Sequence, residues 1–381
     1  MKISSINVYK VTLPFQFTFS HSQKDARSVD NIVVEILTRS QGLRGYGEGG
    51  PRPYVTGETQ DTAIRDVELL CLDDRFPWEL HHVEQIWAFV ESATSDKSHN
   101  AALCALEMAL LDVLGKKQGR NVLYYLPTDY ATDNIHYGAT IPIADHDMIL
   151  SMFRKMKEFD MGDVRLKMGK DFQWNRRALE ILRQTLGFDC DVRVDVNGDW
   201  DLILAEQHLP LLGFHGVSIL EQPLPPHDKS WKDLLTMAKP HNLKFMADES
   251  VCSLEDTERA ISEGYFDVIN VRLSKCGGFF NSLRIIRRIR DAGLNYQVGC
   301  QLGESGILSA AGRALSAVSC DALYYDGSYD AFLLKGNLTT EHVTFNHAGR
   351  AVPLQGPGLG VTVEPKNLDR FSNSILTVSL P

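Results

Sequence analysis

The sequence predicts an α/β protein whose main part is a TIM-like barrel of parallel strands, preceded by a smaller strand-plus-helix domain. Short apolar runs alternate with helix-like stretches through the middle of the chain, and charged residues near the ends of these runs recur every 26 to 28 residues. This step is the length of a strand, a loop, a helix and a return loop. The 381 residues also exceed the roughly 250 that such a barrel needs, which leaves room for the second domain.

Five apolar runs define the centre of the predicted barrel: Val164 to Met168, Val192 to Val196, Val217 to Leu220, Leu243 to Ala247 and Val268 to Leu273. The same step extends the series backwards to Thr140 and forwards to Gln301 and Asp326, which gives eight strand ends. The stretches between them have the spacing of amphipathic helices. These predicted helices are Asp147 to Phe159, Trp174 to Leu186, Leu202 to Leu212, Trp231 to Ala238, Leu254 to Gly264, Gly278 to Gly293 and Ser305 to Ala317.

The first 130 residues have a different pattern. Lys2 to Val11 and Ser28 to Arg39 alternate apolar and polar residues as antiparallel strands do, and a turn leads from the second into Gly45 to Gly49. The strongest helix signal is Asn100 to Lys117, whose leucines lie on one face. We therefore expect an α+β domain at 1–130, the barrel at 131–340 and a C-terminal segment at 341–381 that returns to the first domain.

Charge and cysteine usage narrow the class of protein. A net charge of −10 argues against nucleic acid and anionic membranes as partners. The seven cysteines form no C-x-x-C pair, so neither a disulfide framework nor a zinc site is indicated. No stretch approaches the length of a transmembrane helix, and the first residues contain no long apolar segment. A soluble protein with a cytoplasmic location is the expectation.

Three carboxylates, Asp195, Glu221 and Asp248, end consecutive predicted strands. In a parallel barrel these ends share one mouth, so the side chains should converge. Hard oxygen ligands of this kind suit Mg²⁺ or Mn²⁺ rather than zinc. Each residue alone could instead be a helix N-cap or a surface acid. Glu249, next to Asp248, could be the ligand instead. Neighbours on a strand point to opposite faces, so only one of the two can serve.

Two lysines, Lys167 and Lys275, bracket these carboxylates, one strand before the first and one strand after the last. They should stand on opposite sides of a bound carboxylate substrate, one to remove its α-proton and the other to deliver a proton to the opposite face. Arg165 lies two residues before Lys167, and its fixed positive charge should lower the lysine pKa. Either lysine could alternatively be a structural salt-bridge partner.

These residues, in their sequence context, resemble the muconate lactonizing (cycloisomerase) branch of the enolase superfamily. The matching motifs are Arg165-Leu166-Lys167, Asp195-Val196-Asn197, Leu220-Glu221-Gln222-Pro223, Asp248-Glu249-Ser250, Lys275-Cys276-Gly277-Gly278, Gly45-Tyr46-Gly47-Glu48 and Gly356-Pro357-Gly358-Leu359-Gly360. The resemblance implies a modified (β/α)₇β barrel with an N-terminal capping domain, and Mg²⁺ on Asp195, Glu221 and Asp248. It also implies acid/base roles for Lys167 and Lys275, an enediolate intermediate, and a homo-oligomer, either a dimer or an octamer.

Two departures from the family pattern bear on the reaction. The usual Lys-x-Lys motif begins here with Arg165, which keeps the charge but excludes proton transfer by that side chain. Dipeptide epimerases of this branch carry Asp-x-Asp at the last strand, and this chain has Asp326-Gly327-Ser328. That weakens an assignment to dipeptides without removing it.

Substrate choice should depend on two loops of the capping domain, Phe15 to Arg27 and Gly50 to Thr59. From these loops His21, Arg52 and Tyr54 are candidate substrate-binding residues, and His21 and Arg52 could pair with a distal anionic group or be ordinary loop charges. From the barrel the candidates are Asn197, Gln301, Glu304 and Asp326.

Three functions remain open from the sequence. The first is racemisation or epimerisation of a small carboxylate, such as an N-acyl amino acid or a dipeptide, with both lysines as acid/base groups. The second is a muconate-type cycloisomerisation or a β-elimination of the o-succinylbenzoate synthase or dehydratase kind, with one lysine moving the proton. The third is a catalytically silent barrel that only binds, against which the complete set of carboxylates and lysines argues.

Overall fold

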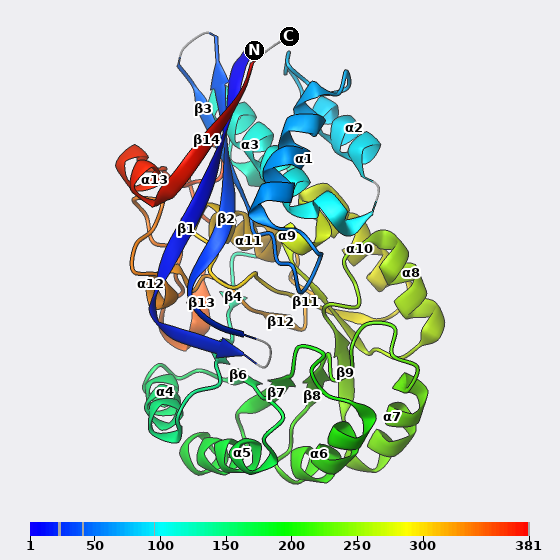
Figure 1. Cartoon of the computed structure of the whole chain (residues 1–381). Coiled ribbons are helices and arrows are strands. Elements are labelled where there is room, and N and C mark those ends of the chain that lie inside the picture. The colour runs from blue at the N-terminus through cyan, green and yellow to red at the C-terminus, as the bar shows by residue number, and fades with distance from the viewer. Residues whose placement is uncertain (22–23, 40–41, 95, 380–381) are drawn as a thin grey trace.

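The computed structural model consists of a TIM-barrel-like α/β domain covered at one end by an N-terminal capping domain (Figure 1). The structure describes residues 1–21, 24–39, 42–94 and 96–379. The alternation of strands and helices predicted from the spacing is present throughout the barrel.

The barrel sheet contains eight strands, which are hydrogen-bonded to their neighbours in chain order. They are β5 (Ala139–Ile141), β6 (Asp163–Lys167), β7 (Asp191–Asp195), β8 (Ile219–Glu221), β9 (Lys244–Ala247), β10 (Val268–Val271), β11 (Asn295–Val298) and β12 (Tyr324–Tyr325). All neighbouring pairs are parallel. The sheet curls until Tyr137, just before β5, forms a parallel bridge with Tyr325 of β12.

A helix follows each strand from β5 to β11 and covers the outside of the sheet (Figure 1). These helices are α4 (His146–Glu158), α5 (Phe172–Leu186), α6 (Leu202–Phe214), α7 (Trp231–Ala238), α8 (Leu254–Glu263), α10 (Phe279–Asp291) and α11 (Gly306–Ala317). Several begin at a side chain that accepts a hydrogen bond from a first-turn N–H, which fixes their starting points. The capping residues are Asp145, Asp171, Asp201, Ser253 and Ser305.

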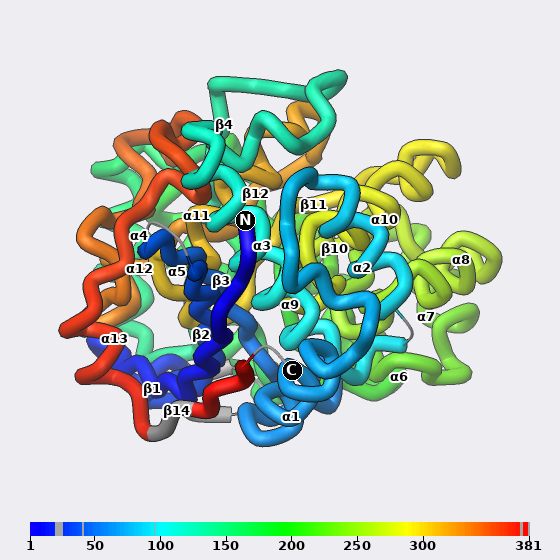
Figure 2. The backbone as a smooth tube through the Cα atoms, turned by 90° about the horizontal axis from the view of Figure 1, so that it is seen from above, coloured from blue at the N-terminus to red at the C-terminus, as the bar shows by residue number. Residues whose placement is uncertain are grey.

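The capping domain is an antiparallel sheet with helices packed on one face. Its strand order is β14 (Ser372–Ser379), β1 (Ile3–His21), β2 (Lys24–Thr38) and β3 (Arg44–Gly49), so the last strand of the chain pairs with the first (Figure 1 and Figure 2). The helices are α1 (Gln60–Leu72), α2 (Val83–Ala93) and α3 (Asn100–Gln118). Short helices α9 (Leu273–Cys276), α12 (Asp330–Leu333) and α13 (Pro365–Phe371) and the small pair β4 (Ile135–His136) and β13 (Arg350–Ala351) complete the chain.

Glycines explain how closely β3 approaches α3. Gly45, Gly47 and Gly49 alternate along the strand, so all three face the helix. A Cβ atom at Gly47 would lie 2.0 Å from the carbonyl oxygen of Ala105. The strand can therefore lie against the helix backbone only because it carries no side chain on this face.

Two acids join the capping domain to the barrel through helix N-termini. Glu107 of α3 accepts hydrogen bonds from the backbone N–H groups of Phe279 and Phe280, at the start of α10. Glu48 of β3 accepts hydrogen bonds from the Ser305 hydroxyl at 2.6 Å and the Leu308 N–H at 2.9 Å, at the start of α11. A carboxylate in this position is stabilised by the unpaired N–H groups of the helix end.

The structure differs from the predicted elements in two places that matter for the site. The expected loop Phe15 to Arg27 is instead largely part of a long hairpin, since β1 continues to His21 and β2 begins at Lys24. The apolar run to Leu273 ends early as a strand, because β10 stops at Val271 and the helical turn α9 follows.

No helix in the described part of the chain is long and apolar enough to cross a membrane.

We expect Gly47→Ala to lower the free energy of unfolding by about 1–3 kcal/mol, because the added methyl group overlaps the α3 backbone. Gly162→Ala is the matched control, since a Cβ atom there meets no neighbour within 4 Å. Urea denaturation followed by circular dichroism measures both. Equal stability of the two variants would show that the strand and helix are not in close contact.

Candidate active site

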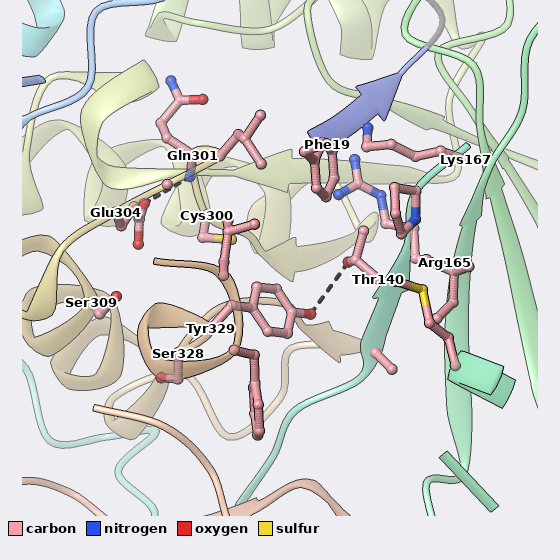
Figure 3. A pocket seen from close by; sticks show the side chains of 18 of the residues that line it. Phe19, Thr140, Arg165, Lys167, Cys300, Gln301, Glu304, Ser309, Ser328 and Tyr329 are labelled. Carbon is pink, nitrogen blue, oxygen red and sulfur yellow. Dashed lines mark hydrogen bonds between the residues drawn. The ribbon is translucent and has the colours of Figure 1, made fainter. Parts of the chain in front are cut away.

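A cavity of about 300 Å³ lies at the carboxyl ends of the barrel strands, and both domains contribute to its wall. Phe17, Phe19 and Tyr54 come from the capping domain. Arg165 and Lys167 of β6 point into it from the barrel, near Phe19 (Figure 3). Cys300, Gln301 and Tyr329 lie on other parts of the wall (Figure 3). The location matches the end of a barrel where active sites are built.

The three predicted carboxylates gather at this end of the barrel. The parallel register sets Lys167 beside Asp195, and Asp195 beside Glu221. Asp248 follows β9 directly, and all three acids are fully buried. Consecutive strands thus bring the three side chains to one rim, as the sequence predicted.

Two guanidinium groups lie between these carboxylates. Arg165 Nη2 is 2.5 Å from Asp195 Oδ2 and 2.8 Å from Glu221 Oε1. Arg272 Nη2 contacts Asp248 Oδ2 and is 3.8 Å from Glu221 Oε1. Burial alone would raise the pKa of Asp195, but Arg165 and Lys167 outweigh it and hold that pKa well below the usual value.

The chemistry of the donors fits a hard divalent cation. All three side chains offer oxygen, and Glu221 Oε2 is buried without an aligned hydrogen bond, although Arg165 Nε lies 2.6 Å away. Within the described ranges, however, no three Asp, Glu, His or Cys side chains converge closely enough to form a ready-made metal cluster. The two arginines take the space between the oxygens, which was not anticipated from the sequence.

Lys167 has the surroundings of a basic group with a lowered pKa. Its Nζ atom donates to Asp195 Oδ2 at 2.7 Å and to Asn197 Oδ1 at 2.9 Å, and the side chain lines the cavity. Burial lowers the pKa of Lys167, Arg165 lowers it further, and the attraction of Asp195 opposes the change. The predicted effect of Arg165 on this lysine therefore has a physical basis in the structure.

Lys275 is not among the described residues that line the cavity, and its role as the second acid/base group stays a prediction. It is fully buried, and its Nζ atom donates to the carbonyl oxygens of Asp248 at 2.8 Å and Asn270 at 2.6 Å, and to Asp248 Oδ1 at 3.0 Å. These bonds use all three N–H donors of an ammonium group. The physical reason is the helical turn α9, which carries Lys275 away from the mouth and into the barrel wall.

Arg272 takes the position predicted for Lys275. It directly follows β10, lines the cavity, and stands four strands from Lys167 in the eight-stranded sheet. The group that faces Lys167 across the site is therefore an arginine. The sequence signal was present, because Arg272 is the charged residue nearest to the end of the valine-rich run.

Some of the predicted substrate-binding residues line the cavity, and Arg52 and Asp326 do not. Tyr54, Asn197, Gln301 and Glu304 line the cavity. Glu304 accepts a hydrogen bond from the Gln301 N–H at 2.7 Å, and burial raises the pKa of Glu304 to about 8. The side chain of His21 lies outside the described residues.

Arg52 does not line the cavity and instead makes hydrogen bonds that hold the capping domain against Leu302 of the barrel. Its guanidinium donates to the carbonyl oxygens of Asp30, Pro51 and Leu302 and to Asn31 Oδ1. A side chain engaged in this way has a structural role here, and its pairing with a distal anion on the substrate stays a prediction.

Asp326 is also withdrawn from the cavity. Arg193 Nη1 and Nη2 lie 3.2 and 3.0 Å from its two oxygens, Gln297 donates to it at 3.2 Å, and Arg165 is 3.5 Å away. Two buried guanidinium groups thus contact this acid, and its role at the distal end of the substrate stays a prediction.

Glu249 is buried near the rim as well. Its Oε1 atom accepts from Asn197 Nδ2 at 3.1 Å, and burial raises the pKa of Glu249 to about 7. Asp248 and Glu249 were expected to point to opposite faces of a strand. Because β9 ends at Ala247, both lie in the turn that follows it and both are buried.

Comparison with known proteins places the chain in a family. Residues 151–367 match the model described as Enolase C-terminal domain-like. The L-Ala-D/L-amino acid epimerase of Maribacter sp. is 31% identical over 94% of this chain and 99% of its own length. The chain therefore belongs to the enolase superfamily. Its relatives include epimerases, racemases and cycloisomerases, and like them it is an enzyme.

Two solved structures illustrate the similarity. N-succinyl Arg/Lys racemase from Bacillus cereus superposes with a TM-score of 0.86 at 22% identity, over 99% of this chain and 100% of that one. Dipeptide epimerase from Enterococcus faecalis, complexed with Mg and the dipeptide L-Leu-L-Tyr, superposes with a TM-score of 0.81 at 25% identity, over 95% of this chain and 100% of that one. The first establishes the fold.

If Lys275 is structural, its loss should unfold the barrel wall. We expect Lys275→Met to lower the free energy of unfolding by about 3–5 kcal/mol, because Asp248 Oδ1 and two carbonyl oxygens lose the hydrogen bonds that the buried ammonium group donates. Lys170→Met, an exposed lysine paired with Asp199, should cost no more than about 1 kcal/mol. Chemical denaturation compares the two, and wild-type stability of Lys275→Met would refute the structural role.

Proposed function

We propose that this enzyme removes the α-proton of a small carboxylate substrate with the help of Mg²⁺, through an enediolate intermediate. The observation that carries the proposal is Lys167, a buried lysine with a lowered pKa at the cavity wall, beside three buried carboxylates. Mn²⁺ is an alternative metal, since it accepts the same oxygen donors.

The relatives suggest the substrate and the net reaction. Their names include an L-Ala-D/L-amino acid epimerase, an N-succinyl Arg/Lys racemase and a dipeptide epimerase that was solved with Mg. We propose that this chain likewise acts as a racemase or epimerase, on an N-acyl amino acid or a dipeptide.

The proposal extends to the architecture and the assembly. We assign the barrel as a modified (β/α)₇β barrel at 131–340, with the capping domain at 1–130 and the returning segment at 341–381. Strand β14, which pairs with β1, supports that return. Homo-oligomeric assembly and a cytoplasmic location stay predictions.

Each polar side chain of the site has its own role in the proposed reaction. Asp195, Glu221 and Asp248 would hold the metal, which would bind the substrate carboxylate and stabilise the negative charge of the intermediate. Lys167 takes the α-proton, and Asn197 orients its amine through the 2.9 Å hydrogen bond. Arg165 keeps a fixed positive charge close to the base and to the developing anion.

A one-base reaction is the second candidate, and Arg272 is the observation that favours it. Racemisation needs a group that returns a proton to the face opposite the base. A guanidinium group keeps its proton at neutral pH and is a poor acid, so it stabilises charge far better than it exchanges protons. Cycloisomerisation or β-elimination needs only Lys167 as base.

We expect Glu221→Gln to weaken Mg²⁺ binding at least tenfold, because one charged ligand of three becomes neutral. Isothermal titration with Mg²⁺ measures this directly, and Glu263→Gln on the exposed face of α8 is the control. Unchanged affinity in Glu221→Gln would place the metal elsewhere.

Deuterium exchange separates the two candidate reactions. A racemase washes deuterium from D₂O into both enantiomers of its substrate, whereas a one-base enzyme labels only the enantiomer whose α-proton faces Lys167. In either case we expect Lys167→Ala to lose at least about a hundredfold in exchange rate. Arg272→Lys should speed exchange on the opposite face, because it places a titratable amine there.

Mass spectrometry and chiral chromatography follow the label and the configuration. Exchange that survives in Lys167→Ala at the wild-type rate would show that another group is the base.

A further inference from the structure

Racemisation by the proposed route needs a second group that exchanges protons, on the side of the cavity away from Lys167. Arg272 lines the cavity, but its guanidinium keeps its proton at neutral pH. Lys275 donates to three oxygen atoms within the barrel wall. Among the described residues that line the cavity, Glu304 is the one carboxylic acid. A carboxyl group can both release and accept a proton, so Glu304 is suited to this task.

The other ionisable groups of the wall suit it less. Burial raises the pKa of Tyr54, Tyr329 and Cys300 above their usual values, so these side chains keep their protons. Lys155 lies on α4, which follows β5 and precedes β6, and is therefore on the same side of the barrel as Lys167.

The loop that carries Glu304 is held in place at the barrel mouth. It follows β11, and the capping domain bonds it twice. Arg52 donates to the Leu302 carbonyl oxygen at 2.6 Å, and Asn31 donates to the Gly303 carbonyl oxygen at 3.0 Å. Gly303 has a φ of +76°, a backbone conformation that favours glycine. These contacts fix the direction in which the next side chain, that of Glu304, leaves the backbone.

One oxygen atom of the Glu304 carboxyl group is engaged and the other is open. Oε1 accepts a hydrogen bond from the Gln301 N–H at 2.7 Å, and this is the one hydrogen bond of the carboxyl group within the described part of the chain. Oε2 lies near α11 at Gly312, which has no side chain, and even an added Cβ atom there would be 4.0 Å away. Oε2 is thus available to a bound molecule.

Lys167 and Glu304 stand on different sides of the cavity. Figure 3 shows Lys167 at one side of the pocket and Glu304, beside Gln301, at the other. Their strands are not neighbours, because β12 and β5 lie between β11 and β6 in one direction, and β7, β8, β9 and β10 in the other. A planar α-carbon held between the two groups would present one face to each.

Burial keeps Glu304 protonated near neutral pH. Desolvation is the largest cause of its raised pKa of about 8, and the nearby Glu48 of β3 adds to it. Arg52, in the loop after β3, and Arg272, at the end of β10, oppose the rise in this pKa. Below about pH 8 the carboxyl group can therefore donate a proton, and above that pH it is a carboxylate that can accept one.

We propose that Glu304 is the second acid/base residue of the reaction and exchanges a proton with the face of the α-carbon opposite Lys167. The inference rests on the proposed function, because it takes Lys167 as the base on the other face.

The proton transfers balance in both directions. In one direction the neutral amine of Lys167 takes the α-proton, and the electron pair of the broken C–H bond moves into the enediolate. The O–H bond of Glu304 then breaks, its proton forms the new C–H bond on the opposite face, and a carboxylate remains. In the other direction the Glu304 carboxylate takes the proton and the Lys167 ammonium group delivers one. Exchange with water restores the starting protonation of both groups.

The test follows deuterium uptake and configuration separately, with the Mg²⁺-loaded enzyme in D₂O. The probes are N-acetyl- and N-succinyl-phenylalanine and L-alanyl-phenylalanine, each with L and D configuration at the phenylalanine α-carbon. Mass spectrometry measures α-deuteration, and chiral chromatography measures inversion. With the wild type we expect both configurations of the fastest probe to take up deuterium and to invert.

Glu304→Gln should separate inversion from exchange. The amide cannot transfer the proton, so inversion in both directions should fall at least about a hundredfold, and so should exchange of the configuration whose α-proton faces Glu304. Exchange of the configuration that faces Lys167 should stay within about threefold of the wild type. A general loss of stability would instead lower all of these rates by the same factor.

Glu107→Gln is the matched control. Glu107 is likewise fully buried, and burial raises its pKa to about 8, but it lies outside the cavity lining and accepts hydrogen bonds at the start of α10. This variant should keep the wild-type ratio of inversion to exchange.

The pH dependence of the wild type needs no variant. Inversion of the configuration that faces Lys167 requires the protonated form of Glu304, so its rate should fall as the pH rises through about 8. Exchange of that configuration without inversion does not need Glu304 and should not show this decline.

The outcomes distinguish the inference from the proposed function. Inversion at the wild-type rate in Glu304→Gln overturns the inference, and the second proton then comes from another group such as Lys275. Equal losses of inversion and exchange in Glu304→Gln, or a wild type that exchanges one configuration without inverting it, also overturn the inference and leave the proposed function standing. Failure of every probe to exchange overturns the proposed function, and the inference falls with it.

Discussion

Buried charges of opposite sign balance one another at the barrel mouth, and this balance positions the side chains of the site. Asp195, Glu221 and Asp248 are fully buried, and neighbouring carboxylates share the same arginines. Buried carboxylates require such compensating positive charge. Arg165 and Arg272 supply it across the mouth, and Lys275 supplies it from within the wall. Each of these cations therefore compensates the charge of a buried carboxylate. Among them and Lys167, only Lys167 combines such an ion pair with a position on the cavity surface and a lowered pKa.

The capping domain forms part of the cavity because it is anchored where the barrel helices begin. The side chains of Glu48 and Glu107 accept hydrogen bonds at the N-termini of α11 and α10, so buried hydrogen bonds to backbone N–H groups hold the interface. The bonds made by Arg52 to Asp30, Asn31 and Leu302 tie the hairpin to the same region. The aromatic residues of the hairpin are thereby kept over the mouth, where they form part of the apolar wall of the cavity.

Much of this arrangement could be predicted from the sequence. Strand ends recur at a fixed step, so Lys167, Asp195 and Glu221 were placed correctly on neighbouring strands. The mistakes arose where local geometry breaks the regular pattern. Because a single helical turn follows Val271, Arg272 lines the cavity where Lys275 was expected. Apolar periodicity cannot detect so short a turn. The engagement of Arg52 and Asp326 depends on residues distant in sequence, which no local pattern reveals.

The pairing of β1 with β14 has a consequence for how the molecule is made. Strand β1 precedes all the barrel strands in the chain, and its edge partner β14 follows all of them. Until β14 arrives, one edge of the capping sheet presents unpaired backbone N–H and C=O groups along β1. Contacts of such large sequence separation also form slowly, because the loop they close is long. A nascent chain of this protein thus passes through a stage in which its barrel strands exist while an open sheet edge remains exposed to other chains, so its vulnerability to aggregation should be greatest after the barrel strands are made and before β14 pairs with β1.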